Sequence, residues 1–555
     1  MMKYKPQPLA PSFIDAVIWE RLVPKDHPLR RAREQVDFSF VNERLAHLYH
    51  PSNGRPAYSP ELLARLTFLQ IEYGWSDRGV IMEAWTSNAV RYFLGLLIDD
   101  DVPHPSLLPR YRDRVGEEGF KDIFGGIFEQ AESLGLVESK RVLIDSYTIE
   151  ADISVPGFRR LLDRIITRAL RALEGTPEIA DTVEQLRREH GELAEDKSYQ
   201  LGPEQRRQLL AEWLALAGRV ADLLEARDGE RSPQQSKALE LLEAALARAE
   251  NHDKRNIKKD DILSDVDPDA RWSRKGRGRE TKAGYQEQLA VDADSGFVTN
   301  VETNPGNVDD SEVLQSVLAG HIENVGGTPE EVVTDSKYQS GENRAYLKSE
   351  GIGDFIAAPA TKGSKQGRFS ASDLQVEWDE QTGEPVAVVC PNGQRTEKRR
   401  YAEGKHAWVF TYSLAQCRGC PLRDKCMTTR KKRKNKQPSR ERGRQWSVDQ
   451  HFRLMQEARA RQESEAGKAA QIARLDIERR FSYQKRRGGN RARYRGLAKN
   501  RMWGWMWAIW FNVRQIMSIR DRQSKEAAAQ VGEKLYTSPG RPGSQDAKRV
   551  KVGQR

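Results

Sequence analysis

Cysteine is scarce in this chain, and no apolar run is long. Four of the 555 residues are cysteine, and all four lie between positions 390 and 426. Such sparse, clustered thiols argue against a disulfide-stabilised secreted protein. The first residues lack the apolar core of a secretion signal, and the most apolar stretch, 502–511, is too short to span a bilayer. We therefore expect a cytoplasmic protein without a membrane partner.

The chain is basic, and its excess of positive charge is concentrated in the last quarter. The formal net charge is +10 and the sequence pI is about 9.2. This balance indicates a polyanionic partner, although the total alone also fits a generally basic soluble protein. Hydrophobic residues make up 38% and charged residues 31%, which is polar for a globular protein without being typical of disorder.

The order of periodic patterns predicts a mixed α/β protein with several units. Ser59 and Pro60 begin a helix that Gly74 ends, and further short helices follow, which fits either a helix-turn-helix DNA-binding unit or a small helical core. The predicted units are a helical N-terminal domain (1–135), the first part of an α/β core (136–157), a helical insertion (158–255), the second part of the core (256–365), a basic, strand-poor, cysteine-containing insertion (366–445), a C-terminal helix with a basic segment (446–522) and a disordered tail (523–555).

Three acidic residues stand where a nucleic-acid-cutting site needs them. Asp145 and Asp335 each follow an apolar run typical of a buried strand, so both carboxylates should emerge at a sheet edge. Glu478 lies in a helical stretch, four residues after Arg474 and therefore on the same helical face. Taken singly, each acid is more often a turn, cap or surface residue. Together they form a ligand set for two Mg²⁺ ions on a phosphodiester.

The segment after Glu478 contains no acidic residue. Between 479 and 501 it carries ten arginine and lysine residues and no aspartate or glutamate. Side chains of one sign repel one another, so we expect a nearby polyanion to neutralise them. A nucleic acid bound beside Glu478 would meet this requirement.

These residues carry a family resemblance that spans about 10–520. The chain resembles the DDE transposases of bacterial insertion sequences, in the branch with an N-terminal helical transposase domain and a cysteine cluster before the final acid. The matching motifs are LVPKDHPL at 22–29, GRP at 54–56, FLG at 93–95, RDR at 112–114, IDS at 144–146, 285–292, NPGNVD at 304–309, TDSKY at 334–338 and YRGL at 494–497.

The resemblance implies an RNase H-like catalytic core whose catalytic, metal-binding acids are Asp145, Asp335 and Glu478. Related enzymes share a signature of tyrosine, two residues, arginine, three residues, glutamate, six residues and lysine. The last three positions are matched here, but Gln471 replaces the tyrosine. The residues that the resemblance and the basic segment together assign to DNA binding are Arg474, Lys485, Arg486, Arg487, Arg493 and Arg495.

The implied activity is cleavage of element ends and strand transfer into target DNA. Two Mg²⁺ or Mn²⁺ ions would serve as cofactors, double-stranded DNA would be the partner, and the protein would associate with the nucleoid. Two DNA ends imply at least a homodimer in the active complex. A metal-dependent nuclease or a domesticated DNA-binding protein on the same fold are the alternatives.

The cysteines and tryptophans remain to be assigned. Cys390, Cys417, Cys420 and Cys426 could hold a structural Zn²⁺, with His406 as a substitute ligand. Reduced thiols and an iron–sulfur cluster are the alternatives. The basic run at 430–434 would then bind phosphate, unless it is a solvated loop. The aromatic face of 503, 507 and 510 is expected to pack in the core rather than stack on bases.

Overall fold

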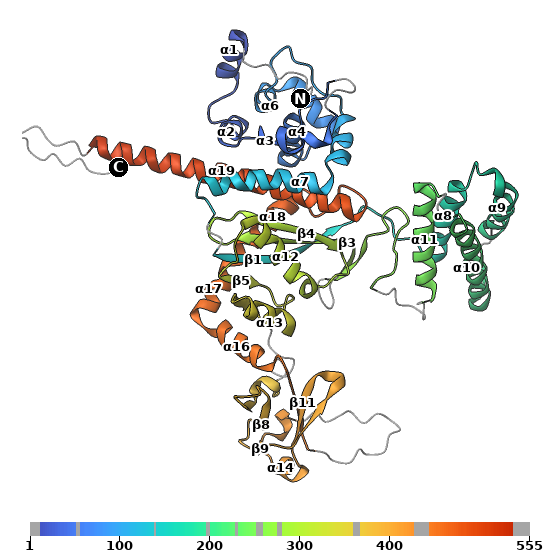
Figure 1. Cartoon of the computed structure of the whole chain (residues 1–555), viewed down its shortest axis with the longest axis vertical. Coiled ribbons are helices and arrows are strands. Elements are labelled where there is room, and N and C mark those ends of the chain that lie inside the picture. Colours follow the sequence, from blue (N-terminus) through green and yellow to red (C-terminus); the bar gives the residue numbers. More distant parts are fainter. Residues whose placement is uncertain are drawn as a thin grey trace, which may run out of the picture.

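The computed structural model describes residues 12–50, 56–137, 140–195, 200–227, 231–250, 259–274, 280–358, 367–426 and 443–536. A central sheet lies below a layer of long helices, and the N-terminal helices cover that layer from above (Figure 1). A helical bundle projects from one side, and a small β module lies at the opposite end from the N-terminal helices.

The N-terminal region is helical, as the sequence predicts. Ser59 caps the helix at Pro60–Tyr73 through its hydroxyl, and Gly74 ends it in the left-handed conformation at φ 70°. The position of Ser106 before the apolar residues 107 and 108 predicts a helix cap there, but its hydroxyl meets His104 and not the helix backbone. The helices are α1 (Phe13–Leu22), α2 (Pro28–Gln35), α3 (Phe40–Arg44), α4 (Pro60–Tyr73), α5 (Asp77–Thr86), α6 (Asn88–Leu94) and α7 (Leu107–Ser133).

The central sheet is mixed, in the order β4–β3–β1–β5–β6, with β2 pairing the beginning of β3. Strand β1 runs antiparallel to β3 and parallel to β5, and β5 runs parallel to β6. The turn residues 294–296 between two strand-like runs predict a hairpin, which is confirmed as β3 and β4. The strands are β1 (Arg141–Glu150), β2 (Arg271–Arg274), β3 (Thr281–Asp292), β4 (Val298–Pro305), β5 (Glu331–Thr334) and β6 (Gly353–Ile356).

Both faces of this sheet are covered. Helices α12 (Asp310–Val325) and α13 (Gly341–Ser349) contribute to the core on one face, and the sequence predicted both. On the other face lie α18 (Leu475–Arg486) and α19 (Leu497–Tyr536), with α19 between the sheet and α7. Trp503, Trp507 and Trp510 are at most 4% exposed, which confirms core packing.

Residues between β1 and β2 form a separate helical bundle around Trp213. Its helices are α8 (Phe158–Ala172), α9 (Ala180–Glu195), α10 (Pro203–Glu225) and α11 (Pro233–Glu250). Apolar positions recur at helical spacing on each of them, and the bundle buries those faces in a core of its own.

The cysteine-containing region is not strand-poor, contrary to the sequence prediction. It holds two three-stranded sheets, β7–β8–β9 and β10–β11–β12. The strands are short and several carry charged residues on an exposed face, so their hydrophobic alternation is weak. The elements are β7 (Gln375–Trp378), β8 (Pro385–Val389), β9 (Arg395–Thr396), β10 (Arg399–Ala402), β11 (Ala407–Thr411), α14 (Leu414–Arg418), α15 (Arg423–Cys426) and β12 (Gln445–Asp449).

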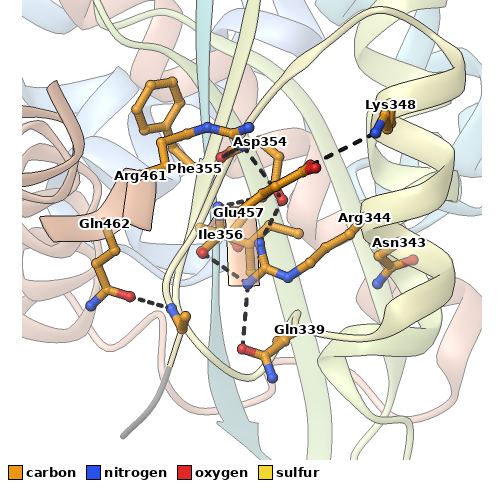
Figure 2. A network of polar contacts seen from close by, with 12 residues as sticks. Gln339, Asn343, Arg344, Lys348, Asp354, Phe355, Ile356, Glu457, Arg461 and Gln462 are labelled. Carbon is orange, nitrogen blue, oxygen red and sulfur yellow. Dashed lines mark hydrogen bonds and ion pairs between the residues drawn. The ribbon is translucent and has the colours of Figure 1, made fainter. Parts of the chain in front are cut away.

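Helices α16 (Phe452–Glu463) and α17 (Glu465–Ala473) lead from the β module back to the sheet. A polar network fixes α16 and α13 to the end of β6 (Figure 2). The fully buried Arg344 donates to an Asp354 carboxylate oxygen at 2.5 Å and to the Ile356 carbonyl at 3.1 Å. Arg461 of α16 donates to the Asp354 carbonyl, also at 2.5 Å.

The predicted disordered tail begins too early. Helix α19 continues through Gly532 to Tyr536, because residues 525–530 are mostly strong helix formers and the first proline of the predicted tail stands only at 539. The rest of the predicted tail, 537–555, lies outside the described residues.

Candidate active site

Two of the three predicted acids lie side by side at the centre of the sheet. Ile144 of β1 pairs with Thr334 of β5 in parallel register, so the next residues, Asp145 and Asp335, are neighbours. Asp335 directly follows β5, as predicted. Asp145, however, does not end its strand. Tyr147 and Ile149 continue the buried alternation, and β1 extends five residues past the acid.

Helix α18 lies over the face of the sheet to which Asp145 points. Side chains alternate along a strand, so Leu143, Asp145 and Tyr147 share one face. The Tyr147 ring packs against Phe481 of α18, with ring centroids 4.8 Å apart. Glu478 precedes Phe481 by less than one helical turn, so its carboxylate emerges at the rim of this contact.

Arg474 joins the first acid to the last. Its guanidinium donates to Asp145 Oδ2 at 2.7 Å and lies 2.9 Å from Glu478 Oε1. The Asp145 residue is 7% exposed, whereas the Glu478 side chain is 48% exposed. The predicted pairing of Arg474 with Glu478 on one helical face is thus present, and the same guanidinium also reaches the strand.

An acid that the sequence did not single out lies near Tyr338, as Asp145 and Asp335 do. Asp310, at the start of α12, is 4% exposed and forms an ion pair with Lys337 at 3.3 Å. Burial, with Asp310, Asp145 and Asp335 nearby, raises the pKa of Tyr338 well above its usual range. The position of Asp310 in the first turn of a helix is also that of an ordinary capping residue, so the sequence offered no distinct signal.

The three predicted acids supply the hard oxygen donors that Mg²⁺ prefers. Throughout the described ranges, however, no three or more His, Cys, Asp or Glu side chains are gathered closely enough to hold a metal ion. Between Asp145 and Glu478 the guanidinium of Arg474 stands where a shared cation would stand. The donor chemistry therefore fits a divalent ion, provided that Arg474 moves away.

Gln471, which replaces the signature tyrosine, contacts the strand ends. Its side-chain amide donates to the Phe355 carbonyl at 2.9 Å and to the Thr334 carbonyl at 3.4 Å. Thr334 directly precedes Asp335, so this helix residue touches the backbone that carries the second acid. The replacement therefore removes an aromatic ring but provides an amide that links α17 to β5 and β6.

The basic segment is partly neutralised within the chain, which corrects the reasoning from sequence. The N-terminal helices supply its counter-charges: Lys499 lies 2.9 Å from Asp113, and Arg487 lies 3.8 Å from Glu72. Arg493 donates to the Trp75 carbonyl at 2.9 Å. Among the residues assigned to DNA binding, Lys485, Arg486 and Arg495 are exposed.

The four cysteines line one cavity of about 30 Å³ in the β module. The Arg444 amide donates to Cys417 Sγ at 3.5 Å, and burial raises the pKa of Cys426. His406 is exposed and does not line the cavity. The thiols are free, so zinc at this place stays a prediction. The basic run at 430–434 lies outside the described residues.

Comparison with known proteins identifies both ends of the chain. Residues 17–114 match the family model described as a transposase domain (DUF772), and residues 389–517 match a transposase DDE domain, a family that implies an RNase H-like fold. No curated protein and no solved structure matches the chain. Within the described residues, every helix is too short or too polar to cross a membrane. The second match contains Glu478 and the helices around it, and together the two matches support an insertion-sequence DDE transposase.

Proposed function

We propose that this transposase cleaves the ends of its element and transfers them to target DNA at a site built from Asp145, Asp335 and Glu478. One observation carries the proposal. Parallel strand register sets Asp145 beside Asp335, and Arg474 ties Asp145 to Glu478. Two strand acids and one helix acid from distant parts of the sequence are thereby brought to one region of the sheet, and the helix that carries Glu478 also carries exposed basic residues.

Two Mg²⁺ or Mn²⁺ ions held by these carboxylates would activate a water or a terminal 3′-hydroxyl and stabilise the leaving 3′-oxygen. The chain's own residues orient the DNA. Arg474 has a planar fork of donors that suits a phosphate as well as it suits a carboxylate. Lys485, seven residues after Glu478 on the same helical flank, is exposed and can bind the next phosphate along the strand.

Double-stranded DNA is the proposed partner, both as the element ends and as the target. The element ends would lie along the exposed basic residues Lys485, Arg486 and Arg495, and Arg487 and Arg493 would add contacts after leaving their intrachain partners. Because transposition joins two ends, a homodimer is the smallest complex that supplies one site for each end.

The test compares wild type with Asp335→Asn on duplex DNA that carries the element ends, with Mg²⁺ present. The matched control is Asp309→Asn, which removes an exposed carboxylate from the neighbouring helix start. We expect nicking at the ends and joining to a target duplex for wild type and control, and neither product for Asp335→Asn. Equal cleavage by all three proteins would overturn the site. Nicked ends without joined products would indicate a nuclease, and binding without any cleavage a DNA-binding protein.

A further inference from the structure

A cavity of about 430 Å³ lies between the sheet, α18 and α19. Its floor is formed by Leu143 and Val291, and the turn between β3 and β4 closes one side. Arg479, Arg480 and Arg514 line it from the two helices. The volume is within the range of pockets that bind small ligands.

This cavity is separate from the proposed catalytic site. Ile477, Phe481 and Gln484 are the buried face of α18. At 100° per residue, Glu478 projects from one flank of that face and Arg480 from the other. A ligand in the cavity therefore lies across α18 from the three acids and cannot be the phosphodiester that they cleave.

Arg480 is the unusual group in this cavity. Among the described residues, its guanidinium has no hydrogen bond and no ion pair within 4.0 Å, and its Nε is buried without a partner. The guanidinium carbon lies 5.9 Å from the centroid of the Phe511 ring, and the guanidinium also lies against Gly296.

The cavity is lined by three acids, Asp292, Asp294 and Asp476, and each of them already has an interaction within the protein. Asp476 forms an ion pair with Arg479 at 2.6 Å. The Asp292 carboxylate accepts hydrogen bonds from the Ser295 hydroxyl and the Asp294 amide within its own turn. Arg514 is only loosely paired with Glu72, at 3.7 Å. Of the three lining arginines, Arg480 is thus the one that has no ion pair among the described residues.

We propose that this cavity binds a backbone phosphate of DNA through Arg480, as a second DNA contact on the flank of α18 opposite Glu478. The inference rests on the proposed function, because a transposase must hold DNA beyond the cleaved bond. A desolvated guanidinium gains more from an anion than a solvated one does. A free phosphate ion offers the same chemistry, so the experiment must separate the two sources.

The experiment measures binding of a fluorescent duplex carrying the element end by anisotropy, over a series of salt concentrations. The proteins are wild type, Arg480→Gln, Arg480→Lys and the control Arg188→Gln, which removes an exposed arginine from the helical bundle. One lost phosphate contact lowers the slope of log affinity against log salt by about 0.9, which is about an eightfold loss at 0.1 M salt. We expect this change for Arg480→Gln, and the wild-type slope for Arg480→Lys and Arg188→Gln.

The second arm titrates inorganic phosphate without DNA and follows the thermal midpoint of each protein. A phosphate-dependent rise lost in Arg480→Gln, together with an unchanged DNA slope, would show a free-anion site and overturn the DNA assignment. If Arg480→Gln keeps the wild-type salt slope of DNA binding and phosphate does not raise the thermal midpoint of wild type, the cavity is not an anion site of either kind. An equal decrease of the salt slope in Arg188→Gln and Arg480→Gln would also count against a specific site at Arg480.

Failure of this inference differs from failure of the proposed function. If wild type cleaves the ends and Asp335→Asn does not, the catalytic site stands whatever the slope of Arg480→Gln. If wild type does not bind the duplex at all, both proposals fall.

Discussion

Glu287 is a carboxyl group enclosed in the sheet, and its titration should weaken the fold. It lies on β3 opposite Tyr147 and is fully buried. Its Oε1 accepts hydrogen bonds from the Tyr147 hydroxyl at 2.9 Å and the Gln484 amide at 3.1 Å, while Oε2 has no partner among the described residues. Burial raises the pKa of Glu287 from 4.5 to about 7, more than these bonds lower it.

The raised pKa of Glu287 sets the sign of the pH dependence of folding stability. A carboxyl group with a raised pKa in the folded state binds its proton more tightly there than in the unfolded chain. Its contribution to stability is therefore greatest below pH 4.5, is lost as the pH rises from 4.5 to about 7, and stays constant above that. The full loss amounts to about 3 kcal/mol of unfolding free energy at 1.36 kcal/mol for each pKa unit.

The substitution Glu287→Gln removes the charge and keeps the acceptor oxygen. The new amide nitrogen replaces Oε2, near the Thr303 hydroxyl, which lacks a partner in the described residues. At about pH 8 we expect the variant to be more stable than wild type by up to about 3 kcal/mol, and at about pH 5 by much less. Urea unfolding followed by tryptophan fluorescence measures both, with the exposed Glu403→Gln as control. A stability difference that is the same at both pH values would refute the reasoning.

Three further substitutions test single contacts. Gln471→Leu leaves two strand-end carbonyls without their amide donor, so we expect the free energy of unfolding to fall by about 1–3 kcal/mol. We also expect half-maximal cleavage to need a higher Mg²⁺ concentration. An unchanged Mg²⁺ dependence would limit Gln471 to a role in stability. Arg344→Met leaves Asp354 charged and largely buried without its main partner, and should lower the free energy of unfolding by about 3–5 kcal/mol, whereas a loss below about 1 kcal/mol would contradict this account. If the cysteine cavity holds zinc, elemental analysis should find about one Zn²⁺ per chain in wild type and none in Cys417→Ser; a metal-free wild type would indicate reduced thiols.

The sequence indicated the local elements well where periodicity and caps agreed. Ser59, Pro60 and Gly74 define both ends of α4, and Gly296 marks the hairpin between β3 and β4. The short strands of the β module escaped prediction, because a four-residue strand with charged residues, such as Arg399–Ala402, has too little alternation to be told from a loop.

The surroundings of the candidate site could be predicted less well, because they depend on long-range pairing. The adjacency of Asp145 and Asp335 follows from strand register, which a single sequence does not specify. The counter-charges of the basic segment come from the N-terminal helices, nearly 400 residues earlier for Lys499 and Asp113. Burial of Glu287 likewise depends on its neighbours, since glutamate is rarely enclosed unless paired.

The chain breaks its helix at Arg474. The predicted pairing of Arg474 with Glu478 is present, but the single helix predicted around it is divided into α17 and α18. The sequence pattern of residues 471–485 predicts one continuous helix, but α17 ends at Ala473 and α18 begins at Leu475. Arg474 keeps right-handed helical angles, φ −58° and ψ −23°, so its pairing with Glu478 survives the break. The interruption lets α17 place Gln471 against the strand ends while α18 lies over β1. A single straight helix would have to favour one of these contacts, so the break lets Arg474 link Glu478 to Asp145 while Gln471 stays on the strand end that precedes Asp335.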